Sequence, residues 1–279
     1  MADAILDARV DRRELLRTAL EAARAAAALV EKGWRKHPAV EHKGRVDLVT
    51  QFDRDSETLL RARLGRTPFP VVGEEQGGEP AGGTHAATWY VDPLDGTTNF
   101  VHGHPFWCVS VGLVAGNDPV LGVVVAPSIG VEWAGIVAGD PGAGWATRNG
   151  DACRVSDVAA LDDALLATGF PYDRRTSPDN NFDAFVAIKK KSQAVRRCGS
   201  AAIDLCLVAD GTYDGYWERK VHPWDVGAGS AIVLAAGGRI TDFEGCAARL
   251  TGGIVVATNG RVHDALLAEL ATVSLAGRR

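Results

Sequence analysis

The sequence predicts a mixed α/β fold of the α+β kind, and two observations on the order of its segments support this. In the first half, two stretches with apolar residues at helical spacing precede four short segments rich in β-branched and aromatic residues. In the second half, strand-like and helix-like stretches alternate. We therefore expect helices packed on an antiparallel sheet in the first half, and an α/β alternation in the second.

The chain opens with two predicted helices. Within residues 11–36, apolar side chains recur every three or four positions among good helix formers, and a glycine and a proline mark the end. After a polar loop with a short extended piece, Asp53–Leu64 is predicted as a second amphipathic helix. Phe69–Val72 is a predicted strand that runs into a Gly-Glu-Glu exit, and residues 76–87 predict a glycine-rich surface loop.

Strands dominate the next part of the chain. The four expected strand segments are 88–92, 106–116, 119–128 and 131–139. The sequence Gly-Asn-Asp-Pro between the second and third predicts a hairpin turn. Residues 142–156 are expected to form another β-ribbon.

The second half alternates between the two kinds of element. Strands are expected near 164–171, 193–199, 213–218 and 253–260. Helices are expected near 181–192, 200–211, 223–238 and 262–270. We find no internal repeat and no obvious linker, so residues 1–150 and 151–279 are expected to pack as two halves of one compact unit.

Composition narrows the classes of function. The net charge is −5 with no long basic run, so nucleic acid is not the expected partner. The five cysteines are odd in number and none are spaced as CxxC, which argues against a disulfide framework or a zinc site and favours a reducing cytoplasm. We find no signal peptide, and no stretch approaches the ~18 uncharged apolar residues that would span a membrane.

Six acidic residues stand at the ends of predicted elements: Asp53, Glu74, Glu75, Asp92, Asp95 and Asp225. Each alone has an ordinary explanation as a helix cap, a turn residue or a solvated loop acid. Together they indicate more, because apolar strands would carry Glu74 and Asp92 to the same end of a sheet. Carboxylates are the ligands that Mg²⁺ prefers, and two such ions about 4 Å apart can activate a water molecule and neutralise a leaving oxygen.

The stretch "WYVDPLDGTTNF", residues 89–100, concentrates this signal. Asp92 and Asp95 flank a predicted turn, so both can face one point, and the Leu94 carbonyl is free to face it too. A helical turn starting at Gly96 would aim free N–H groups at an anion, and Thr97 would add a hydroxyl. A second candidate anion cradle is the "CGSAA" stretch, residues 198–202, whose alternative reading is an ordinary serine-capped helix.

These residues resemble the inositol monophosphatase family of Mg²⁺-dependent, lithium-sensitive phosphatases. "DPLDGTTNF" and "PWDVGAGSAIVLAAGG" are similar to its two signatures, and "VDLVTQFD" and "VVGEE" to the flanking pieces, in family order. The similarity runs from about Arg13 to Leu270. It implies the layered αβαβα sandwich of the inositol monophosphatase and fructose-1,6-bisphosphatase type, and usually a homodimer.

The resemblance also implies roles for single residues. Glu74, Asp92 and the Leu94 carbonyl would hold one Mg²⁺, and Asp92, Asp95 and Asp225 a second; a third, weaker ion could bind near Glu74. The catalytic residues would be Thr97, Asp53 and Glu74, with the Thr97 hydroxyl hydrogen-bonded to Asp53 and orienting the attacking water. Gly96 and Thr97 would bind the phosphate through backbone groups. Asp95, Gly199, Ser200, Ala201 and Glu218 would contact substrate hydroxyls. Lys43 occupies the loop where relatives place a lysine, one residue closer to the aspartate.

The expected reaction is the hydrolysis of a small phosphate monoester, with inositol-1-phosphate as the leading substrate. Fructose-1,6-bisphosphate and histidinol phosphate are the alternatives, and a 3′-phosphonucleotide is disfavoured because the motif reads "GTTNF". Arg219 and Lys220 would favour the bisphosphate if they faced the pocket. A regulatory binding role, as in some bacterial relatives, is the alternative from another class. The seven histidines lack ligand spacing and are expected to be surface or packing residues.

Overall fold

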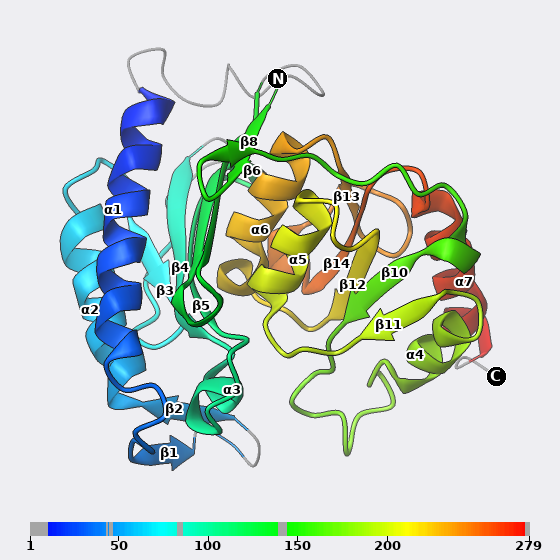
Figure 1. Cartoon of the computed structure of the whole chain (residues 1–279), viewed down its shortest axis with the longest axis horizontal. Helices are drawn as coiled ribbons and strands as arrows, with labels where there is room; N and C mark the ends of the chain where they lie inside the picture. The colour runs from blue at the N-terminus through cyan, green and yellow to red at the C-terminus, as the bar shows by residue number, and fades with distance from the viewer. Residues whose placement is uncertain (1–10, 43, 45–46, 83–85, 139–143, 277–279) are drawn as a thin grey trace.

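The structure, a computed structural model, describes residues 11–42, 44, 47–82, 86–138 and 144–276. It forms five layers in the order helices, sheet, helices, sheet, helices (Figure 1). Three hydrophobic clusters fill the spaces between these layers. The αβαβα sandwich expected from the sequence is therefore present.

The first helical layer contains α1 (Arg12–Glu31) and α2 (Gln51–Leu64). The buried stripe of α1 is mostly alanine, which lets the helix lie close to the sheet. Helix α2 begins two residues before the predicted start. The reason is a capping box, in which Thr50 accepts from the backbone of the first turn while Asp53 accepts from the Thr50 backbone N–H at 2.8 Å.

The second layer is a seven-stranded sheet in the order β3-β4-β5-β6-β7-β8-β9. Its strands are β3 (Val71–Gly73), β4 (Ala87–Asp95), β5 (Cys108–Ala115), β6 (Asp118–Ala126), β7 (Val131–Ile136), β8 (Trp145–Arg148) and β9 (Asp151–Ala152). Only the β3–β4 pair is parallel. The predicted hairpin between β5 and β6 is present, and both faces of these central strands are buried.

The middle layer holds α5 (Ala201–Ala209) and α6 (Pro223–Ala235), which lie side by side between the two sheets (Figure 1). Glycines let α6 approach the first sheet closely. A Cβ atom at Gly122 would lie 2.1 Å from the Ala228 carbonyl oxygen, and one at Gly112 would lie 2.6 Å from the Ala228 nitrogen. Any larger residue at either position would push α6, and the acidic residue in its first turn, away from the sheet.

The second sheet has five strands in the order β11-β10-β12-β14-β13. They are β10 (Leu165–Thr168), β11 (Ala194–Arg196), β12 (Gly215–Arg219), β13 (Arg239–Thr241) and β14 (Ile254–Thr258). Helices α4 (Phe182–Lys189) and α7 (His263–Ala276) cover its outer face. The short strand β13, which the sequence did not predict, forms the edge. The division into halves at residue 150 stays a prediction.

The remaining elements are short. A separate two-stranded ribbon pairs β1 (Val40–His42) with β2 (Leu48–Thr50), and α3 (Thr97–Val101) follows β4 directly. Single 3₁₀ turns occupy 127–129, 161–163 and 250–252. Across the described residues, no helix is both long and apolar enough to cross a lipid bilayer. All five cysteines are free thiols.

Candidate active site

The parallel pairing of β3 and β4 brings two of the predicted acids together. Gly73 pairs with Val91, so Glu74 and Asp92 are the next residues along two neighbouring strands that run in the same direction. Strands β3 and β4 are apolar and largely buried before these acids, as is usual for strands of a sheet covered on both faces. The prediction that both acids reach the same sheet end is confirmed.

The link between Asp92 and Asp95 is a β-bulge, and the predicted turn is wrong. Strand β4 continues to Asp95, and three steps along it oppose two steps along β5, since Asp92 pairs with Ser110 and Asp95 with Cys108. In a regular strand, residues three apart face opposite sides of the sheet. The one extra residue restores the alternation, so both carboxylates lie on the same face. Pro93 is tolerated here because a bulge does not require its missing N–H.

Gly96 ends the strand and starts α3. Its φ of 92° is left-handed, and a Cβ atom there would lie 2.8 Å from the Phe106 carbonyl oxygen, so only glycine fits without strain. Helix α3 then begins at Thr97, one residue after the start at Gly96 considered in the sequence analysis, and Gly96 is its N-cap. The backbone N–H groups of its first turn have no helical partner, and they border the same cavity as the acids.

Thr97 is held from two sides. Its hydroxyl lies 3.1 Å from Asp53 Oδ1 and 3.0 Å from the Leu94 carbonyl oxygen. Asp53 is completely buried and accepts from the Thr50 backbone and hydroxyl, at 2.8 and 2.6 Å, through its other oxygen. Burial raises the pKa of Asp53, and these hydrogen bonds oppose the rise. The expected contact between Thr97 and Asp53 is therefore present.

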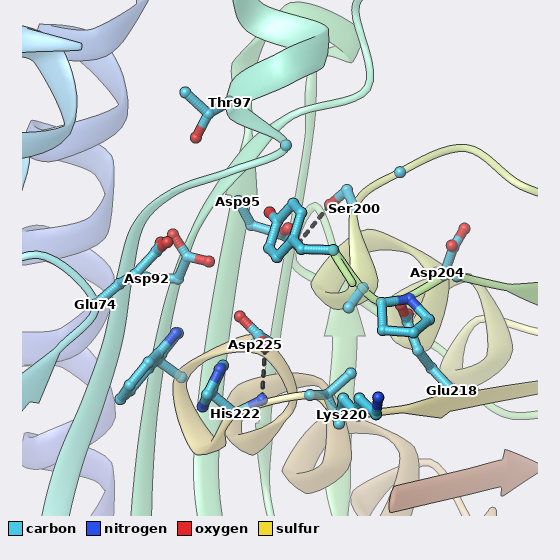
Figure 2. A pocket seen from close by; sticks show the side chains of 18 of the residues that line it. Glu74, Asp92, Asp95, Thr97, Ser200, Asp204, Glu218, Lys220, His222 and Asp225 are labelled. Atoms are coloured by element: carbon cyan, nitrogen blue, oxygen red, sulfur yellow. Dashed lines mark hydrogen bonds between the residues drawn. The ribbon is translucent and has the colours of Figure 1, made fainter. Parts of the chain in front are cut away.

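Asp225 reaches the site from the middle helical layer. It occupies the first turn of α6, and its carboxylate accepts a hydrogen bond from the His222 backbone N–H at 2.6 Å. Pro223 at the first helical position favours this start. Figure 2 shows Asp225 across the cavity from Glu74 and Asp92, so acids from three elements face one space.

That space is a cavity of about 280 Å³ between the two sheets. The sequence-predicted residues that line it are Glu74, Asp92, Leu94, Asp95, Gly96, Thr97, Gly199, Ser200, Ala201, Glu218 and Asp225. Asp53 lies behind Thr97 and touches the cavity only through it. Lys43 lies outside the described residues.

Asp95 links the two halves of the cavity wall. Its Oδ2 accepts from the Ser200 hydroxyl at 2.7 Å and from the Ala202 backbone N–H at 2.8 Å. Ser200 is also the N-cap of α5, because its Oγ accepts from the Ile203 N–H at 3.3 Å. The serine-capped helix and the cavity wall are thus the same feature, and Asp95 is fixed by the free donors of that helix.

Glu218 lies on the same side of the cavity as Ser200. It projects from β12, and the hydroxyl of Tyr216 donates to its carboxylate. Burial raises the pKa of Glu218 to about 7, against the opposing effects of Tyr216 and of the Arg197 charge. This carboxyl therefore changes its charge near neutral pH.

The acids perturb one another's ionisation. The pKa of Asp92 is raised well above its usual range by burial and then by Glu74, Asp95 and Asp225. Burial also raises the pKa of Asp225 well above its usual range, and that of Asp95 to about 6. Clustered buried carboxylates repel, and a bound cation would offset the repulsion.

The donors available here are carboxylate and carbonyl oxygens, the set that hard divalent cations such as Mg²⁺ prefer, so the residues fit such an ion. In the described part of the chain, no group of three acidic, histidine or cysteine side chains is arranged to hold a metal ion as it stands. The residues fit a divalent cation because their donor atoms are oxygens and because they line one cavity.

Sequence reasoning missed several residues of the cavity wall: Asp47, Tyr172, Arg197, Asp204 and His222. The most informative is Asp204, a single acid within the apolar helix α5, which is itself a signal. His222 lines the cavity while its ring stacks on Trp224 with centroids 4.7 Å apart.

Arg219 and Lys220 do not act as a pair. Lys220 lines the cavity, but its Nζ donates to Asp173 at 2.6 Å and to Ser177 at 2.9 Å. Arg219 forms an ion pair with Asp179 and packs over the Phe243 ring. Arg219 is not part of the cavity lining.

Comparison with known proteins agrees with this geometry. An inositol-1-monophosphatase of Synechocystis sp. is 41% identical over 92% of this chain and 88% of its own length. A fructose-1,6-bisphosphatase/inositol-1-monophosphatase of Aquifex aeolicus is 36% identical over 83% of this chain and 85% of its own length. The solved inositol monophosphatase of Anabaena (Nostoc) sp. superposes with a TM-score of 0.82 at 38% identity, over 93% of this chain and 96% of that one. Residues 11–275 match the pattern of one family. The chain belongs to the inositol monophosphatase family.

Proposed function

We propose that the protein is a Mg²⁺-dependent phosphatase that hydrolyses inositol-1-phosphate to inositol and phosphate. The observation that carries the proposal is the convergence of Glu74, Asp92, Asp95 and Asp225 on a cavity that also contains the start of α3. The similarity to inositol monophosphatases over nearly the whole chain supports the substrate class.

We assign the metal ligands as follows. Glu74, Asp92 and the Leu94 carbonyl are proposed to hold one ion, Asp92, Asp95 and Asp225 to hold a second, and Glu74 to lie near a third. When bound, these ions would supply activation of water and neutralisation of the leaving oxygen. Asp92 lies beside Glu74 on the neighbouring strand and shares a sheet face with Asp95, so it would be the ligand common to both ions.

Thr97, Asp53 and Glu74 are the proposed catalytic residues. The Thr97 hydroxyl carries one proton, which it donates to Asp53 with the Leu94 carbonyl as the alternative acceptor, so its lone pairs can accept a hydrogen bond from an attacking water. As the water passes a proton to the Thr97 oxygen, the Thr97 hydroxyl proton moves to Asp53, and burial, which raises the pKa of Asp53, favours that transfer. Glu74 accepts from the water on the other side of the cavity.

The substrate would lie between these residues and α5. The backbone N–H groups at Gly96 and Thr97, at the start of α3, would bind the phosphate oxygens. Asp95, Gly199, Ser200, Ala201 and Glu218 line the part of the cavity that would receive the alcohol, where carboxylates and backbone groups can bind hydroxyls. Most of the rate gain comes from positioning and charge stabilisation, and no covalent nucleophile is required.

A bisphosphate is the weaker candidate substrate. The sequence argument for it needed Arg219 and Lys220 in the pocket, and Arg219 is engaged with Asp179 and Phe243 instead. Lithium sensitivity and a homodimer are further parts of the proposal and rest on the family alone. A cytoplasmic location rests on the five free thiols.

The test is phosphate release from inositol-1-phosphate by the purified, chelator-stripped protein before and after millimolar Mg²⁺ is added. We expect turnover only with the ion, and a fall of at least about 10²-fold in Asp92→Asn. Fructose-1,6-bisphosphate and histidinol phosphate serve as competing substrates in the same assay. The proposal fails if no sugar or polyol monophosphate is hydrolysed with Mg²⁺ present.

A further inference from the structure

Asp204 is a buried acid that the assignments above leave without a role. It is 1% exposed, and its Oδ1 atom has no hydrogen-bond partner among the described residues. Leaving a buried polar atom unpaired costs roughly 1–3 kcal/mol, so such an atom calls for an explanation. Three other buried side-chain atoms share this condition, in Trp34, Trp107 and Ser230, and none of those residues lines the active-site cavity.

The position of Asp204 connects it to the alcohol side of the cavity. Its backbone N–H donates to the Ser200 carbonyl oxygen at 3.0 Å, so it lies one helical turn beyond Ser200 on the same face of α5. Asp204 lines the same cavity as Glu218 and Arg197, and Figure 2 shows it beside Glu218, on the side away from Glu74.

The charged groups around Asp204 also suit it to binding a hydroxyl. Burial raises its pKa well above the usual range, Glu218 and Asp95 raise it further, and Arg197 lowers it. A carboxyl in this environment can both donate and accept a hydrogen bond, which matches an alcohol hydroxyl. A structural buried acid would be expected to have a protein partner, as Asp214 does when it accepts from the Ser156 hydroxyl and the Leu165 backbone N–H.

We propose that Asp204 is a specificity-determining residue that hydrogen-bonds a ring hydroxyl of the substrate and so selects polyol phosphates over esters without hydroxyls. The inference rests on the proposed phosphatase activity and adds a residue to its substrate-binding set. Asp204 binds the alcohol part of the substrate and takes no part in water activation.

The test compares two esters of secondary alcohols on a six-membered ring: inositol-1-phosphate and cyclohexyl phosphate, which lacks the hydroxyls. In Asp204→Ala, kcat/KM for inositol-1-phosphate should fall about tenfold, the size of one lost hydrogen bond, while that for cyclohexyl phosphate changes less than about twofold. Asp204→Asn, which keeps the shape and one acceptor, should fall between. Where cyclohexyl phosphate turns over too slowly, its inhibition constant replaces kcat/KM.

A matched control is Asp210→Asn, at the end of the same helix. Asp210 accepts from the Trp133 indole at 3.0 Å and pairs with Arg148, so its loss should lower the melting temperature and leave the substrate ratio unchanged. Asp204→Ala should melt no lower than wild type, because it removes an unpaired buried group. An unchanged substrate ratio in both Asp204 variants overturns the inference. Failure of the wild type to hydrolyse either ester would instead refute the proposed function.

Discussion

The contact between Asp53 and Thr97 yields a prediction that separates catalysis from stability. Asp53→Asn keeps the shape of the side chain and leaves one oxygen to accept from Thr50, whose N–H and hydroxyl now lie at 2.8 and 2.6 Å. The new NH₂ group faces Thr97, so the hydroxyl there can no longer pass its proton to this neighbour. We expect kcat to fall about 10²- to 10⁴-fold, the usual contribution of general-base catalysis.

The fold should survive this change. The ionised carboxylate is already penalised by burial, which raises the pKa of Asp53, so a neutral amide loses little. Some stabilisation is lost because the amide carries no charge at the positive end of α2 and accepts less strongly from Thr50. These effects oppose each other, and we expect a change in unfolding free energy of about 1 kcal/mol or less.

The assay is phosphate release at saturating Mg²⁺, with thermal melting as the stability readout. Thr97→Val should lower kcat by a similar factor, and the double variant should be little worse than either single one, because the two residues act as a unit. The matched control is Asp55→Asn on the same helix, where an exposed carboxylate accepts a hydrogen bond from Gln51. Multiplicative losses in the double variant, or an equal loss in the control, would refute the reasoning.

Three further predictions concern backbone strain and pH. Gly96→Ala should cost roughly 1–2 kcal/mol or more for its left-handed backbone and its approach to Phe106, and should lower kcat further by displacing α3; melting and turnover measure both. In metal-free protein, Glu218→Gln should raise the free energy of unfolding more at pH 8 than at pH 5. The folded pKa of Glu218, about 7, lies above the ordinary 4.5, so the wild type loses stability as the pH rises between these values. Equal changes in melting temperature at both pH values would argue against this. His263 is buried between two threonine hydroxyls, and burial lowers its pKa to about 4 from 6.5. The wild type should therefore lose stability as the pH falls from 6.5 to 4, and His263→Gln should lose less. Parallel curves of melting temperature against pH would contradict this.

The motif residues and most elements could be predicted from the sequence because each carries a local signal. Apolar alternation and length mark the strands, and Pro223 and Asp225 mark the start of α6. The proximity of Glu74 and Asp92 followed from two buried strands that end in acids. The capping box at the start of α2 also has a sequence signal, since Thr50 is followed three residues later by Asp53.

The features that escaped prediction depend on contacts between distant segments. The bulge after Asp92 exists only relative to β5, since the extra residue is defined by pairing with Ser110 and Cys108. The isolation of Asp204 depends on β12 and on what surrounds α5 in the fold. The orientation of Arg219 depends on Asp179, forty residues earlier in the chain. A single sequence gives no measure of such long-range geometry.

The central claim is that the acids of β3, β4 and α6 hold the metal ions on which catalysis depends. Crystals soaked in Mn²⁺, with data collected at an anomalous wavelength, test this most directly. The account predicts at least two anomalous peaks about 4 Å apart among Glu74, Asp92, Asp95 and Asp225, and their loss in Asp92→Asn. An enzyme that is active with Mn²⁺ in solution but shows no peak among these four residues would contradict it.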